Sequence, residues 1–204
     1  MTVGVGTPTL KPLKLKCTAS DCENDLHCFL QKVQKPRPHG GPCRSCGKDL
    51  VDFRRIHDRS IDDVENTFQA LSTEWIRHQF WERPLDQKAV NHARRKGARH
   101  IREAGAEKRI RQSVGAARNP REGKQTPYEG NVLYYAQHAV AACCRKCIEY
   151  WHGIAMGRAL TDEEVGYLSR LLVLFVARRL PDLDDGPVKV PAIRRPKHGG
   201  RAHG

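Results

Sequence analysis

Two Cys-x-x-Cys pairs stand about a hundred residues apart in this chain of 204 residues. They are Cys43/Cys46 and Cys144/Cys147. Four thiolates can close one tetrahedral zinc site, because structural zinc is held by four ligands and accepts sulfur readily. Gly47 follows the first pair and gives its turn the backbone freedom of a zinc knuckle. We therefore predict one zinc ion bound by both pairs; the alternatives are buried apolar thiols and disulfides.

Three further cysteines, Cys17, Cys22 and Cys28, lie within 12 residues and indicate a second zinc site. Its fourth ligand is open, because His27 competes with Cys28 for one position. The other candidates for this ligand are Cys143, His39 and His57. The sequence thus predicts one or two zinc ions.

A predicted helix over 131–152 carries groups that could transfer protons or bind phosphate. At about 100° per residue, four of them fall on one side of it: His138, Arg145, Glu149 and His152. Two imidazoles, a carboxylate and a guanidinium are the composition of a proton-transfer or phosphate-handling site. The alternative is that each histidine is a satisfied core or surface side chain, or a zinc ligand.

The catalytic interpretation has two versions. His138 and His152 would be about 20 Å apart on a straight helix that rises about 1.5 Å per residue. Both cannot contact one phosphate, so we favour His138 as the general acid or base and treat His152 as a zinc or capping residue. The second version places a catalytic metal near His57 and Asp58.

Positive charge is concentrated in two stretches. Lys and Arg number 36 against 23 Asp and Glu, a net charge of +13. The stretch 86–124 contributes +8 and the stretch 187–204 contributes +5, so the rest of the chain is balanced. Such a surface favours a polyanion, most simply nucleic acid, although exposed arginines also promote solubility. The predicted phosphate-binding residues are Arg94, Arg95, Lys96, Arg99, Arg102, Lys108, Arg109 and Arg111.

The elements that must position these groups are helices. Ser60 can cap a helix with an apolar stripe, Asp86 can cap another, and Thr161 begins a capping box before the last. The basic stretch 99–112 is also predicted to be helical. The prediction is a mainly α protein in which a zinc knuckle closes a helical domain. Its segments are a mobile leader (1–16), a Cys/His-rich zinc-binding segment (17–59), a helical domain with the second Cys pair (60–180) and a disordered basic tail (181–204).

Composition excludes several classes of protein. The first 16 residues lack the apolar stretch of a signal peptide, and the longest apolar run, 171–177, is too short to span a bilayer. We expect a cytoplasmic protein without a membrane partner, and in a reducing compartment cysteines at ligand spacing favour metal over disulfides. The chain has no GxGxxG element, Walker A loop, GxSxG elbow or HExxH pair.

Three sequence blocks carry a resemblance: Cys43-x-x-Cys46-Gly47, the stretch 91–97 and the stretch 134–153. Together they resemble an uncharacterised bacterial Cys/His-rich protein family over 17–175, which implies a bacterial intracellular zinc-binding protein and no particular activity. The chain is also faintly similar to zinc-scaffolded HNH-type nucleases, in which two Cys-x-x-Cys pairs frame a water-activating histidine. That similarity implies the same four cysteines as the frame, and His57, followed by Asp58, as the activating group.

Three classes of function follow. The first is a zinc-stabilised nucleic-acid-binding protein, with RNA favoured over DNA because no recognition-helix motif for duplex DNA is evident. The second is a nuclease acting on RNA through histidine general acid-base catalysis. In the third, zinc is purely structural and the basic surface binds an acidic protein or drives homo-oligomerisation.

Overall fold

Helices joined by loops make up the parts of the chain that the computed structural model describes, residues 15–30, 41–191 and 193. No strand forms in these ranges beyond two isolated bridges, and none of their helices is long and apolar enough to cross a membrane. The mainly α prediction is therefore confirmed. Residues 1–14 of the predicted leader and residues 192 and 194–204 of the predicted tail lie outside the described residues.

The helices are α1 (Phe53–His57), α2 (Val64–Ser72), α3 (Trp75–Glu82), α4 (Gln87–His100), α5 (Ala106–Val114), α6 (Val132–Ala139), α7 (Arg145–His152) and α8 (Asp162–Arg179), with short turns η1 (Cys22–Asn24) and η2 (Ile101–Gly105).

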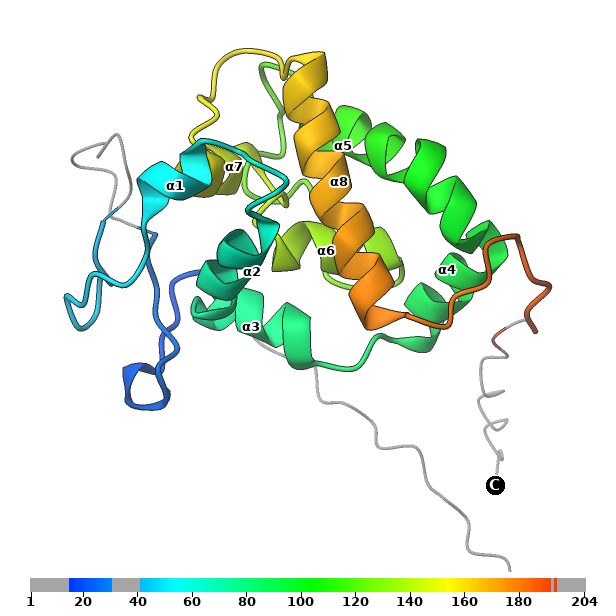
Figure 1. Cartoon of the computed structure of the whole chain (residues 1–204), viewed down its shortest axis with the longest axis horizontal. Helices are drawn as coiled ribbons and strands as arrows, with labels where there is room; N and C mark the ends of the chain where they lie inside the picture. The colour runs from blue at the N-terminus through cyan, green and yellow to red at the C-terminus, as the bar shows by residue number, and fades with distance from the viewer. Residues whose placement is uncertain (1–14, 31–40, 192, 194–204) are drawn as a thin grey trace, which may run out of the picture.

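Helix α8 is the centre of the core. Figure 1 shows it crossing the middle of the molecule, with α4 and α5 on one side and α1, α2, α3 and α7 on the other. It begins at the predicted capping box, in which the Thr161 hydroxyl accepts from Glu164 N–H and the Glu164 carboxylate accepts from Thr161 N–H. Its buried face, which includes Leu168, Leu172 and Phe175, packs mainly against α5 and α6.

The predicted helix over 131–152 is two helices in the structure. Asn131 caps α6 and Gly153 ends α7 with φ +64°, so both predicted ends are confirmed. Between them the chain turns at Ala141, which has φ +55°. The Gln137 side chain donates to Ala142 O at 2.9 Å and holds this turn closed. The break means that residues before and after it do not share one helix face.

Helix α4 has a kink at Gly97, where φ is +76°. The stretch that follows α8 crosses here: Ala98 N–H donates to Asp184 O at 2.9 Å, and Val188 N–H donates to Arg94 O at 2.8 Å. A Cβ on Gly97 would lie 2.5 Å from the carbonyl carbon of Gly186. Residues 181–191, the first part of the predicted tail, thus contain no helix but hydrogen-bond to α4.

We expect Gly97→Ala to lower the free energy of unfolding by more than about 1 kcal/mol, because the new methyl group meets backbone and the left-handed conformation is strained. Gly166→Ala is the matched control. Gly166 lies within α8 with open space around its Cα, so alanine there should stabilise the protein by roughly 0.5–1 kcal/mol. Urea unfolding of both variants measures the two changes in the free energy of unfolding, which should have opposite signs. Equal changes would contradict the prediction.

Candidate metal centre

Four groups from the N-terminal segment form what we call the knuckle cluster: Cys22, His27, Cys43 and Cys46. Their ligand atoms all lie within 4.8 Å of one another. Cys22 Sγ is 3.7 Å from Cys43 Sγ, and Cys46 Sγ is 3.4 Å from His27 Nδ1. A tetrahedral zinc ion with Zn–S of about 2.3 Å and Zn–N of about 2.0 Å separates two sulfurs by about 3.8 Å and a sulfur from a nitrogen by about 3.5 Å. The knuckle cluster therefore has the spacing of a tetrahedral metal site.

The turn at 43–48 is built as predicted for a knuckle. Gly47 has φ +77°, and its N–H donates to Cys43 O at 2.9 Å. Ser45 N–H donates to Cys43 Sγ at 3.4 Å. Burial opposes ionisation of Cys43, but backbone N–H donors outweigh it and lower the pKa of this thiol to about 6. The thiolate, which is the form that binds metal, is thus favoured at neutral pH.

His27 attaches the knuckle cluster to the helical core. Its side chain is fully buried. Its N–H donates to Thr73 O at 2.7 Å, and its carbonyl accepts from Trp75 N–H at 2.8 Å. These bonds join His27 to the backbone where α2 ends and α3 begins. The apolar stripe that the sequence places on one helix after Ser60 is therefore divided over two helices. Figure 1 shows the knuckle segments, in blue and cyan, at the edge of the molecule.

A second group, the core cluster, consists of Cys143, Cys144 and Cys147, whose sulfurs all lie within 4.8 Å of one another and are buried. Arg77 of α3 donates to Cys143 Sγ at 3.5 Å and to Cys147 Sγ at 3.1 Å. Hydrogen bonds from the neighbouring thiols and the charge of Arg77 hold the pKa of Cys143 well below its usual range. The core cluster is therefore suited to hold a thiolate.

The predicted single site for both Cys-x-x-Cys pairs is not formed. Cys43 and Cys46 belong to the knuckle cluster, whereas Cys144 and Cys147 belong to the core cluster. The physical reason is that segment 22–27 reaches the first pair, while the second pair turns inward to Arg77. The predicted second site is also rearranged, because Cys22 joins the knuckle cluster. Cys28 is buried but belongs to neither cluster, and its thiol donates to the carbonyl of Cys17 at 3.5 Å.

A buried ion pair supports the core cluster, and no local pattern in the sequence predicts it. Arg77 Nε donates to Glu74 Oε2 at 3.0 Å, and both side chains are 2% exposed. Trp151 Nε1 donates to the same carboxylate oxygen at 3.0 Å, and Arg77 also donates to His138 O at 2.7 Å. Burial raises the pKa of Glu74, and the positive charge of Arg77 offsets only part of this rise. Charged residues at a spacing of three are common on exposed helices, so nothing local marks this pair as buried.

Two of the three histidines considered for catalysis, His138 and His152, are core residues. His138 stacks on Phe80 with ring centroids 4.5 Å apart, and its Nε2 is 3.2 Å from Thr126 O. His152 is fully buried, with Nε2 2.9 Å from Val140 O. Burial lowers the pKa of each imidazole to about 4, so both are neutral in the folded protein at neutral pH. Neither ring lies on an accessible surface.

The other predicted catalytic side chains brace loops. Arg145 donates to Ala155 O at 2.6 Å, and Glu149 accepts from Met156 N–H at 2.9 Å. His57 Nε2 is 3.2 Å from Tyr150 O. The structure therefore does not bring these groups together at one open site.

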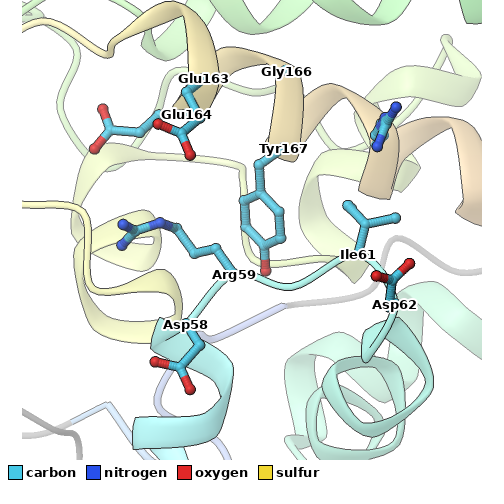
Figure 2. A pocket seen from close by; sticks show the side chains of 9 residues that line it. Asp58, Arg59, Ile61, Asp62, Glu163, Glu164, Gly166 and Tyr167 are labelled. Atoms are coloured by element: carbon cyan, nitrogen blue, oxygen red, sulfur yellow. The ribbon is translucent and has the colours of Figure 1, made fainter.

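Asp58, which follows His57 at the end of α1, lines a hollow of about 520 Å³ between α1 and the start of α8. Figure 2 shows Glu163 and Glu164 on one side of it, with Asp58 and Arg59 opposite. The nine residues that line it include four carboxylates and two arginines, and none of them is a histidine or cysteine. This mixture of charges is ill suited to a phosphate site.

The predicted phosphate-binding residues fall into two groups. In the first, Arg99 and Arg102 pair with Asp185, Arg111 pairs with two acids, and Arg109 is half-buried against Gln137. The second group is exposed, and no carboxylate among the described residues pairs with it. Its members are Arg94, Arg95, Lys96 and Lys108.

The fold and both clusters define a helical protein with Cys/His groups positioned to bind metal. The chain belongs to the family described as Domain of unknown function (DUF4186), which matches residues 65–177, more than half of its length. No solved structure matches this chain. The matched region contains the core cluster and Arg77 but not the knuckle cluster. The resemblance to an uncharacterised family is thus confirmed, and no similarity to a nuclease is shown.

Proposed function

We propose that this protein is a zinc-stabilised nucleic-acid-binding protein, with zinc in the knuckle cluster and phosphate contacts from α4. Three cysteine sulfurs and an imidazole whose ligand atoms lie within 4.8 Å of one another suit zinc better than harder cations, which prefer oxygen ligands. Four protein ligands leave no open position for water, so the metal has a structural role.

The observation that carries the proposal is a run of three exposed basic residues in α4: Arg94, Arg95 and Lys96. No acid among the described residues pairs with them, whereas Arg99, less than two turns further along the chain, is paired with Asp185. Cations free to contact phosphate contribute affinity through counterion release. RNA is favoured over DNA, because no helix with a recognition motif for duplex DNA is evident.

We do not extend the proposal to RNA cleavage. General acid-base catalysis requires an imidazole within hydrogen-bonding reach of the substrate. His138 and His152 are buried and bonded to backbone carbonyls, so they favour a binding protein over a nuclease. The competing function is that of an interaction protein, in which the same basic residues contact an acidic protein or a second copy of the chain.

We expect the triple variant Arg94→Gln/Arg95→Gln/Lys96→Gln to weaken binding of a labelled 20-nucleotide RNA on the order of tenfold or more at 0.1 M salt. The logarithmic salt slope should fall by about two, because each lost contact with a single strand removes about 0.7. Glutamine is used because it keeps helix propensity. Fluorescence anisotropy over a salt series measures both quantities.

The control is Arg99→Gln/Arg102→Gln, which removes charges already paired with Asp185 and should change the affinity less than threefold. Single-stranded and duplex DNA of the same length test the preference for RNA. If the triple variant keeps the parent affinity and slope, α4 is not the binding surface. If the parent binds no nucleic acid, sedimentation with and without acidic proteins tests the interaction function.

A further inference from the structure

The core cluster has three of the four ligands that a closed zinc site needs. Its sulfurs lie within 4.8 Å of one another, which is compatible with the edges of about 3.8 Å in a tetrahedral thiolate site. All three side chains are buried, so water does not readily supply the fourth position. A fourth protein ligand must come from a neighbouring segment.

Cys17 is the sulfur placed to do so. It is half-buried and packs against the hydrophobic core. The thiol of Cys17 interacts electrostatically with Arg77, Cys143 and Cys147. Tyr128 interacts with Cys17 and with the same three residues. Cys17 lies outside the 4.8 Å grouping of the core cluster, so binding would draw its side chain inward. Its backbone is held nearby, because its carbonyl accepts from the Cys28 thiol at 3.5 Å.

Arg77 supplies the surroundings that a buried tetrathiolate site requires. Zinc with four thiolates carries a net charge of −2, which is costly to bury without compensation. Arg77 adds one positive charge and donates to two of the sulfurs, at 3.5 and 3.1 Å. Such outer hydrogen bonds orient metal ligands and stabilise their thiolate form. Glu74 and the carbonyl of His138 hold the guanidinium in place.

We propose that Cys17, Cys143, Cys144 and Cys147 bind a second zinc ion in the core, separate from the knuckle cluster. This ion attaches the segment before η1 directly to α7. The inference is independent of nucleic-acid binding, because none of its ligands lies on the basic surface of α4.

Metal analysis of the purified full chain should give two zinc ions per molecule. Cys17→Ser should give one, whereas Cys28→Ser should keep two, because Cys28 belongs to neither cluster and a serine hydroxyl can still donate to the carbonyl of Cys17. Two zinc ions in Cys17→Ser would overturn the role of Cys17. One zinc ion in the parent would overturn the second site.

Cadmium substitution of the parent protein tests the site without any variant, in case Cys17→Ser does not fold. Cadmium-113 NMR separates sites by the number of coordinating sulfurs. We expect two resonances, one from a site with four sulfurs and one from the knuckle cluster with three sulfurs and one nitrogen. A spectrum without the four-sulfur resonance would contradict the proposal, and failure of RNA binding would leave this result unchanged.

Discussion

Replacing Cys43 with serine is expected to remove one metal ion per chain and to lower the free energy of unfolding by more than about 3 kcal/mol. Structural zinc contributes about 10–16 kcal/mol of binding free energy in small zinc domains, and that energy is also folding energy. Cys43 is 2% exposed and accepts the N–H bond of the knuckle turn. Serine can accept that bond, but its protonated hydroxyl does not replace a thiolate as a zinc ligand. Elemental analysis and urea unfolding measure the two effects.

Ser45→Ala is the control for this variant, since Ser45 is exposed in the same turn and is not a member of either cluster. It should keep the metal and change stability by less than about 0.5 kcal/mol. A chelator should destabilise the parent protein more than Cys43→Ser. A parent protein that contains no metal, and whose stability the chelator does not change, would rule out the knuckle cluster as a zinc site.

The second large effect is expected for Arg77→Met, which should lower the free energy of unfolding by about 3–5 kcal/mol. Removing one partner of a buried ion pair leaves the other charge uncompensated in the interior. Here it also removes the hydrogen bonds to Cys147 and to the carbonyl of His138. Methionine keeps most of the side-chain volume, so the loss measures charge and hydrogen bonding more than packing.

Two further variants test that explanation. Arg178→Met removes an exposed ion pair with Glu65 and should cost less than about 1 kcal/mol. Adding Glu74→Gln to Arg77→Met should recover part of the lost stability, because the unpaired carboxylate is then gone. If both arginine variants cost the same, the pair of Arg77 with Glu74 has no special role in the core.

Local signals were sufficient for several helix ends but not for the breaks between helices. Asp86 and Thr161 cap helices as predicted, and Asn131 caps α6 where the helix over 131–152 is predicted to begin, because a cap depends on neighbouring residues only. The predicted cap at Ser60 is wrong, since α2 begins after Asp63. The breaks at 73–74 and 140–144 depend on contacts from elsewhere. His27 bonds to the backbone between α2 and α3. Gln137, which closes the turn after α6, is held by hydrogen bonds with Arg109 and Ser113 of α5.

The same distinction applies to the candidate sites. Cysteine spacing predicts groups that could bind metal, but the grouping of the pairs depends on which segments meet in space. From spacing alone His27 competes with Cys28 for one ligand position, whereas in the structure His27 completes the knuckle cluster. The basic surface was overestimated for a similar reason: Asp185 follows Arg99 by 86 residues and still pairs with it.

The four ligands of the knuckle cluster lie within residues 22–46, and this has a consequence for biosynthesis. A chain that emerges from the ribosome amino end first can close this loop of about 25 residues before most of the DUF4186 region, residues 65–177, has emerged. Bringing Cys17 to Cys143 closes a loop of 126 residues instead. The entropy of that closure costs roughly 1.5 kcal/mol more, and it must await α7. The first metal can thus be captured by a nascent chain, whereas the second is bound only as the helical core assembles.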